Sequence, residues 1–316
     1  MSGRTKAYTM VGLVAAKCVA LSGCQSLSLA TAIAQYERTL DRYSQTDTTV
    51  TAVTETRHED GREAALVSAF FGLDNGLPNR NTDRVACDGA GGADGMPVIF
   101  SHEVDVETLD PGDFKIATES GAIGEVTCLT LAPADDPGEL RTALLTGNYG
   151  SAEDQPMTVE IVGNILSLDG SINFKGASIA ATRLEVGPTL VWAERVPETD
   201  WALGESATTL PWGGGDKCPV GSKQVIRVTW DGGVTKPGGE PADFEEGQLY
   251  VIDVASEDGP KRTVTAVALA DLKDGDNNHL LCLDTKDTVQ SVSFPAGYLT
   301  DPREDLNPDT KISILN

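Results

Sequence analysis

Six cysteine residues have the chemistry that is easiest to assign from residue type and spacing. They are Cys18, Cys24, Cys87, Cys128, Cys218 and Cys282. Two lie near the start of the chain, and four divide between its two halves, where they can pair in three ways. Pairing within each half predicts the disulfides Cys87–Cys128 and Cys218–Cys282, whose loops restrict the unfolded chain. Zinc is the alternative use of these thiols, but no Cys-x2-Cys spacing supports it.

The polar run from Asp271 to Asn278 is a candidate metal site. Its oxygen-bearing residues include Asp271, Asp274, Asp276 and Asn278. Carboxylate and amide oxygens are the ligands that Ca²⁺ prefers. The run is not an EF-hand, because His279 stands where that loop requires glycine. We therefore predict a calcium site here, with a solvated Asp-Gly hairpin turn as the alternative.

One group of residues is a candidate for catalysis, namely Asp276, His279 and Asp284. A histidine beside carboxylates can transfer protons. The sequence contains neither Gly-x-Ser-x-Gly nor His-Glu-x-x-His. His58 lies in a polar stretch, and the acidic neighbour of His102 points to the other face of an alternating strand. We therefore favour a non-enzymatic binding, adhesion or structural module, with a secreted β-sandwich hydrolase or lyase that uses the three residues as the alternative.

The net charge of −24 and the pI of about 4.3 restrict the partners of the protein. A phosphate polyanion would be repelled, so nucleic acid is not an expected partner. Cations are attracted, and calcium is the cofactor for which the sequence offers ligands. Solubility in salty surroundings is the simpler explanation of the same charge.

The first 23 residues have the three parts of a secretory signal. Arg4 and Lys6 give a positive start, an apolar run extends from Tyr8 to Ala16, and the segment ends in Leu21-Ser22-Gly23 before Cys24. Lys17 interrupts the apolar character. An uncleaved apolar N-terminus is the alternative. No other run approaches about 18 apolar residues, so we expect no transmembrane helix.

The sequence Leu21-Ser22-Gly23-Cys24 resembles the bacterial lipoprotein signal, which reads Leu, Ala or Ser, Gly or Ala, then Cys. The resemblance implies a diacylglycerol on the Cys24 thiol and a mature chain that begins at Cys24. Gln25 follows, and a residue other than Asp there fits the outer membrane of a Gram-negative host. Removal of residues 1–23, which carry three basic residues and no acidic one, makes the net charge −27. The expected partners are the membrane, through the lipid, and an envelope protein or glycan.

Short apolar runs separated by Gly, Pro and Asp follow residue 64 and predict antiparallel strands. The length of 316 residues favours two domains. We predict a mainly β protein with two antiparallel β-sandwich, Ig-like domains. The predicted parts are a signal peptide (1–23), a polar tether that is part helical (24–63), a first sandwich (64–200), a linker (201–217) and a second sandwich (218–316).

Residues 98–121 resemble the opening of a bacterial Ig-like domain of the S-layer type. The matching residues are Val98-Ile99-Phe100-Ser101-His102-Glu103-Val104-Asp105, then Thr108-Leu109, Phe114-Lys115-Ile116 and Gly121. The resemblance implies a structural or adhesive module of the cell envelope. Phe100 and Val104 are expected in its core, and Thr108 to Pro111 in a turn.

Overall fold

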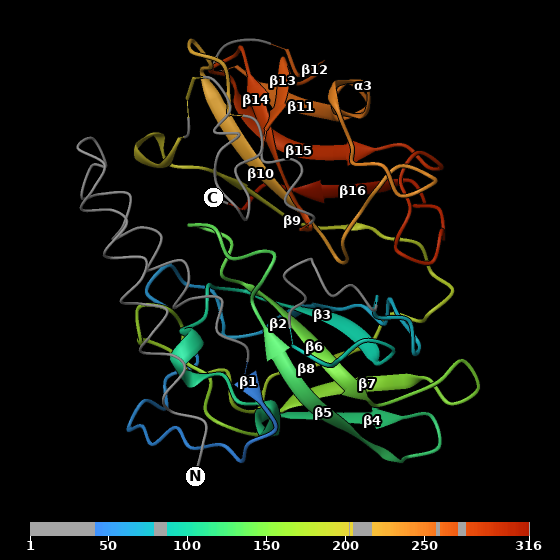
Figure 1. Cartoon of the computed structure of the whole chain (residues 1–316). Coiled ribbons are helices and arrows are strands. Elements are labelled where there is room, and N and C mark those ends of the chain that lie inside the picture. Colours follow the sequence, from blue (N-terminus) through green and yellow to red (C-terminus); the bar gives the residue numbers. More distant parts are fainter. Residues whose placement is uncertain are drawn as a thin grey trace, which may run out of the picture. The chain divides into compact units, whose positions relative to one another are not determined.

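The computed structural model describes residues 42–78, 87–201, 203–204, 217–256, 260–270 and 276–315. Residues 41–316 form one compact unit. The fold is mainly β and its sheets are antiparallel, as predicted (Figure 1). Within the described residues, no helix is both long and apolar enough to span a membrane.

The first group of strands builds one eight-stranded sheet. The strands are β1 (Arg42–Tyr43), β2 (Leu66–Ala69), β3 (Asp94–Phe100), β4 (Phe114–Thr118), β5 (Ile123–Thr130), β6 (Thr142–Asn148), β7 (Pro156–Ile161) and β8 (Ser178–Ala180). Their order is β2-β3-β6-β5-β4-β7-β8, and β1 pairs with β5. Two short 3-10 helices, η1 (Val106–Thr108) and η2 (Pro111–Asp113), precede β4.

This sheet encloses an apolar core that contains Phe100 and Val104, both predicted as core residues. Alternating side chains of the strands supply much of this core, which follows from the period of two. The two ends of the sheet order also meet. Thr182, just after β8, donates its backbone N–H to the carbonyl of Ala69 in β2 at 2.7 Å. This hydrogen bond joins the segment after β8 to β2, so the first and last strands of the sheet order lie next to each other.

The second group of strands forms two four-stranded sheets. The elements are β9 (Leu190–Arg195), η3 (Glu198–Asp200), β10 (Gln224–Trp230), α3 (Phe244–Gly247), β11 (Val251–Ala255), β12 (Arg262–Val264), β13 (Ala268–Ala270), β14 (Asn278–Leu283), β15 (Thr288–Phe294) and β16 (Thr310–Ser313). The sheet orders are β13-β14-β10-β9 and β12-β11-β15-β16. Side chains of both sheets share a second apolar core.

Strand β10 shows how alternation places side chains on both faces of one sheet. Ile226, Val228 and Trp230 lie in the second core. On the other face, Val225 packs with the second disulfide, and the Arg227 side chain donates to backbone carbonyls of the loop before β6. Every residue of β10 is consequently buried.

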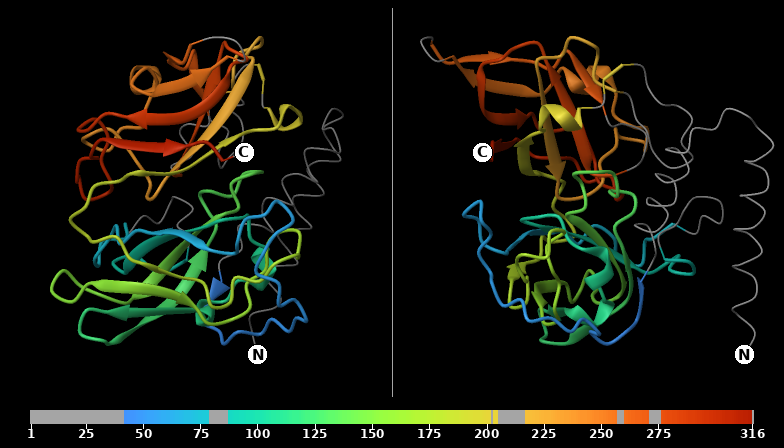
Figure 2. Two further views of the ribbon diagram at one scale, coloured as in Figure 1. Left: turned by 180° about the vertical axis from the view of Figure 1, so that it is seen from behind. Right: turned by 90° about the vertical axis from the view of Figure 1, so that its left-hand side faces the viewer.

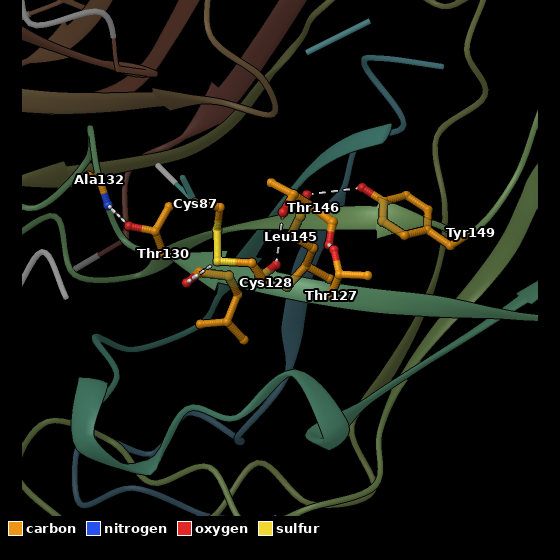
Figure 3. Close-up of a disulfide and its surroundings, with 9 residues drawn as sticks. Cys87, Thr127, Cys128, Thr130, Ala132, Leu145, Thr146 and Tyr149 are labelled. Atoms are coloured by element: carbon orange, nitrogen blue, oxygen red, sulfur yellow. Dashed lines mark hydrogen bonds between the residues drawn. A yellow bond between two sulfur atoms is a disulfide. The ribbon is translucent and has the colours of Figure 1, made fainter. Parts of the chain in front are cut away.

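Both disulfides have the pairing that the division of the cysteines predicted. Cys87 bonds to Cys128 of β5, with their Cα atoms 5.8 Å apart. Cys218 bonds to Cys282 of β14, with their Cα atoms 5.5 Å apart. Figure 3 shows the first bond beside the ladder of β5 and β6, where Thr146 Oγ1 donates to the Cys128 carbonyl at 3.2 Å.

The chain segment that connects the two cores lies N-terminal to the expected linker. Leu184 packs in the first core and Leu190 in the second. We expected β9 to end the first domain, but it is hydrogen-bonded to β10. The segment 201–217 thus connects neighbouring strands of one sheet, and much of it lies outside the described residues. Composition favours a linker at Trp and Gly clusters, but it carries no information on which sheet a strand joins.

We call the strands β2 to β8 and the core that they enclose the first body. Residues 42–63, which we call the arm, lie along this body, where we expected a solvated tether. Residues 24–41 lie outside the described residues. Tyr43 of β1 pairs with Cys128. Further along, Gly112 N–H donates to the Gln45 carbonyl at 3.0 Å, and Asn173 Nδ2 to the Val53 carbonyl at 3.1 Å. Figure 2 shows this blue segment along the green strands in both views. The polar composition of the arm suggested that it is exposed to solvent. Instead, hydrogen bonds of its backbone attach it to the first body, although it has few large apolar side chains.

Candidate functional site

The predicted calcium loop is described only in its second half, because Asp271 and Asp274 lie outside the described residues. Asp276 and Asn278 are buried at the start of β14. Asn278 donates its backbone N–H and its side-chain N–H to the Asp276 carboxylate at 2.8 and 2.9 Å. The amide oxygen of Asn278 accepts from Thr229 Oγ1 at 2.7 Å. These oxygens already take part in hydrogen bonds, and calcium binding at the loop stays a prediction.

The catalytic candidates His279 and Asp284 do not converge. His279 is buried, and its Nδ1 lies 2.7 Å from the hydroxyl of Tyr250. Burial lowers the pKa of His279 to about 4, so its imidazole is neutral at pH 7. Asp284 is exposed and forms an ion pair with Lys223 at 2.7 Å. The imidazole therefore belongs to a core hydrogen-bond network and the carboxylate to the surface.

A pocket of about 160 Å³ lies near the third candidate, Asp276. Its walls are mainly apolar and include Phe70, Leu131 and Pro133. Asp276 is the one titratable side chain among the lining residues in the described part of the chain. Proton-transfer catalysis in a pocket requires convergent titratable groups, and this pocket does not bring Asp276 together with His279 and Asp284.

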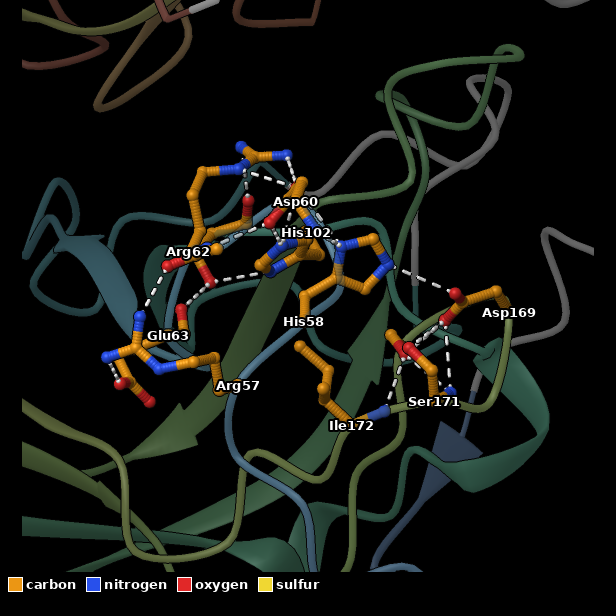
Figure 4. A network of polar contacts seen from close by, with 12 residues as sticks. Arg57, His58, Asp60, Arg62, Glu63, His102, Asp169, Ser171 and Ile172 are labelled. Carbon is orange, nitrogen blue, oxygen red and sulfur yellow. Dashed lines mark hydrogen bonds and ion pairs between the residues drawn. The ribbon is translucent and has the colours of Figure 1, made fainter.

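A different polar cluster connects the arm to the first body (Figure 4). We call it the histidine cluster; it consists of His58, Asp60, Arg62, His102 and Asp169. The Asp60 carboxylate lies at its centre. Its Oδ2 accepts from Arg62 Nε at 2.8 Å and from Nη2 at 2.6 Å. The same oxygen lies 3.1 Å from His58 Nδ1 and 3.2 Å from His102 Nε2.

His58 also reaches a second carboxylate. Its Nε2 lies 3.1 Å from Asp169 Oδ2. The other oxygen of Asp169 accepts from the hydroxyl groups of Ser167 at 2.5 Å and Ser171 at 2.9 Å. His58 therefore bridges a carboxylate of the arm and a carboxylate of the body, and the two serines hold the second carboxylate in place.

A tight turn presents the arm side of this cluster. His58 N–H donates to the Arg62 carbonyl and Gly61 N–H to the His58 carbonyl, both at 2.9 Å. Gly61 has a φ of 86°, a left-handed conformation that glycine adopts readily. The sequence Asp60-Gly61 thus forms a turn that directs His58 and Asp60 to the same side.

The two histidines have opposite pKa shifts. For His58, burial opposes protonation, but hydrogen bonds to Asp169 and Asp60 outweigh it and raise the pKa. For His102, burial and the nearby Arg62 cation lower the pKa despite the Asp60 carboxylate. The pKa of Asp60 lies well below its usual range: burial would raise it, but the hydrogen bonds and charge of Arg62 prevail. The cluster thus combines anionic carboxylates with the Arg62 cation and with a His58 whose pKa is raised above its usual value.

Two imidazoles and a carboxylate are also ligand types of zinc, and one atom each of His58, Asp60 and His102 lie within 4.8 Å of one another. However, Asp60 Oδ2 already receives two N–H groups from a guanidinium cation. A metal ion would have to compete with that charge. The arrangement fits a set of ion pairs between the arm and the first body better than a metal centre.

Sequence reasoning missed this cluster because its members are far apart in the chain. His58 and Asp169 are separated by 111 positions, and neither belongs to a motif with fixed spacing. The local signal was the run from His58 to Arg62, where an Asp-Gly turn is flanked by groups that titrate or carry charge. We assigned that run to a tether, so its turn geometry received no weight.

Comparisons with known proteins add little to this geometry. No protein-family model matches the chain. A search of curated proteins likewise gives no match. Among solved structures, the "N-terminal part of the bacterial S-layer protein SbsC" is similar with a TM-score of 0.26 and 12% sequence identity. The alignment covers 80% of this chain and 44% of that chain, so this chain spans less than half of the compared structure.

Proposed function

We propose that the protein is an exported, lipid-anchored module of the cell envelope that binds or supports a partner without catalysis. The lipoprotein-type signal ending at Cys24 supports the anchor. Disulfides are typical of oxidising compartments outside the cytoplasm, and both pairs present here support export. If the host is Gram-negative, the expected location is the outer membrane.

The observation that carries this proposal is the attachment of the arm. The arm follows the segment that begins at the expected lipid site. It adds β1 to β5 opposite Cys128, and Cys128 is covalently joined to Cys87. A force on the anchor would therefore be distributed over hydrogen bonds and ion pairs along the first body. This arrangement suits a protein that stays attached to a membrane.

The proposed partners follow from charge. A net charge of −24 favours cations and basic protein surfaces, and it disfavours nucleic acid. An envelope protein or a glycan is the proposed binding partner. Catalysis is left out of the proposal because His279 lies in the core while Asp284 lies at the surface. Calcium at the Asp271–Asn278 loop remains a prediction within it.

Detergent phase separation of the protein expressed in bacteria tests the anchor. We expect the wild-type protein in the detergent phase and Cys24→Ser in the aqueous phase or uncleaved, because serine offers no thiol for the lipid. Cys18→Ser is the matched control: it leaves the box at residues 21–24 intact, and it should behave as wild type. Wild-type protein in the aqueous phase would refute lipid anchoring.

A further inference from the structure

We propose that Asp47, Asp110 and Asp113 form a calcium site that fastens the arm to the first body. Asp47 lies in the arm, whereas Asp110 precedes the short helix η2 and Asp113 is its last residue, just before β4. One carboxylate oxygen from each residue lies within 4.8 Å of the other two. The inference goes beyond the proposed function, because cation binding is measured independently of the lipid.

The strongest evidence is a buried carboxylate oxygen without a hydrogen-bond donor. Asp113 is 0% exposed, and its Oδ1 has no hydrogen-bond partner among the residues that the structure describes. Its Oδ2 accepts from the backbone N–H of Asp110 at 2.9 Å. A buried acceptor without a partner is unfavourable, and more so when it is charged. A cation beside Oδ1 would remove this cost.

The surrounding backbone leaves room for that oxygen. A Cβ atom on Gly163 would lie 1.6 Å from Asp113 Oδ1, so no other residue type fits at position 163 without a shift. The Gly163 segment is held there because Val162 N–H donates to the Asp113 carbonyl at 2.7 Å. The position of the unpartnered oxygen is therefore defined by the backbone around it.

The other two carboxylates are held in place by neutral donors. Asp110 Oδ2 accepts from the backbone N–H and hydroxyl of Thr48 at 3.1 and 3.0 Å. Asp47 Oδ2 accepts from the backbone and side-chain N–H groups of Asn164 at 3.2 and 3.3 Å. These bonds orient both carboxylates, but none of the donors carries a positive charge.

The electrostatics of the cluster point the same way. Burial, together with the charges of Asp47 and Asp110, raises the pKa of Asp113 to about 7, although the hydrogen bond from the Asp110 backbone lowers it. The Lys175 cation opposes the shift but does not cancel it, and Lys175 is exposed. Close carboxylates repel one another, and a divalent cation relieves the repulsion.

The ligand chemistry selects calcium. All three donors are carboxylate oxygens, which bind hard cations and do not favour soft metals. Ca²⁺ accepts irregular sets of about six to eight oxygens, including backbone carbonyls and water, whereas Mg²⁺ demands a near-ideal octahedron and gives up its water reluctantly. A bound Ca²⁺ would bridge the arm at Asp47 to the loop at Asp110 and Asp113.

The test uses the full mature protein in detergent, stripped of cations with EDTA and then titrated with CaCl₂ at pH 8. We expect one ion to bind with a Kd below about 1 mM, the range of extracellular modules, and to raise the melting temperature. MgCl₂ at equal ionic strength should bind at least about tenfold more weakly. Equal responses to both salts would overturn the assignment to calcium.

Asp113→Asn is the decisive variant. It should lose the calcium-induced rise in melting temperature and weaken binding by about tenfold or more, because one charged ligand is gone. Without calcium at pH 8 it should melt no lower than wild type, since the amide avoids a buried charge. This readout separates loss of the site from failure to fold.

Two controls complete the test. Asp284→Asn changes an exposed carboxylate outside the cluster and should keep the full response. The double variant Asp274→Asn and Asp276→Asn changes the other predicted calcium loop and should keep it as well. A calcium response that survives Asp113→Asn but disappears in the double variant would overturn the proposal and assign the ion to that loop.

Discussion

At the scale of residues, neighbouring groups of one type take opposite roles according to their partners. The rings of His58 and His102 lie 4.7 Å apart, centre to centre. His58 contacts two carboxylates, whereas His102 is more deeply buried and lies near the Arg62 cation. The same imidazole chemistry therefore gives one histidine that favours the proton and one that disfavours it.

We predict that an NMR titration of the histidine ring protons places His58 above its usual pKa of about 6.5 and His102 below it. Asp169→Asn should shift the His58 titration to lower pH, because one of its two carboxylate partners is lost. His102 should move less than His58, since its hydrogen bonds in the described structure go to Ser101 and Asp60 and not to Asp169. A His58 that titrates at lower pH than His102 would contradict the geometry of Figure 4.

The same shifts fix the direction of the pH effect on stability. A raised folded-state pKa means that the His58 contribution is complete below pH of about 6.5 and is lost as pH rises through the folded-state value. The lowered pKa values of Asp60 and Asp169 act at the acid end, where their contribution is lost as pH falls below about 3.8. The lowered pKa of His102 acts in the opposite direction to that of His58, since a histidine buried in its neutral form loses stability as pH falls below about 6.5.

At the scale of elements, the arm is the feature that sequence patterns predicted least well. Short strands such as Gln224–Trp230 were recognisable because their side chains alternate. The arm has no such alternation, and its attachment depends on donors from distant segments, including Gly112 and Asn173. Pairing partners far apart in sequence leave no local pattern, which is also why the sheet of β9 could not be predicted.

Asn173→Ala tests whether the arm is held by these bonds. The side chain of Asn173 is buried and donates to the Val53 carbonyl at 3.1 Å. Its loss should lower the free energy of unfolding by about 1–3 kcal/mol, the cost of an unmet buried polar group. We also expect faster hydrogen exchange of the arm near residues 51–56.

Asn148→Ala is the matched control for this change, because Asn148 is exposed at the end of β6. It should alter stability by no more than about 0.5 kcal/mol and leave exchange in the arm unchanged. Arm amides that exchange at the rate of an unfolded chain in the wild-type protein would show that the arm is not attached.

At the scale of the whole molecule, two cores and two disulfides divide the chain in the way the cysteines suggested. The pairing was predictable because each bond stays within one half of the sequence. Phe100 and Val104, which we predicted in the core, are buried. These positions and the strands could be predicted because each depends on a local sequence pattern. The histidine cluster and the three-aspartate cluster were not predicted, since each joins the arm to residues more than 40 positions away.

The intact mass of the mature protein recovered from bacterial cells tests the central claim, that this is an exported lipid-anchored module, most directly. We predict a chain that begins at Cys24, carries the added mass of a diacylglycerol, and has four hydrogens fewer than the reduced chain because of its two disulfides. A chain that begins at Met1, or one that begins at Cys24 without lipid, would contradict the claim.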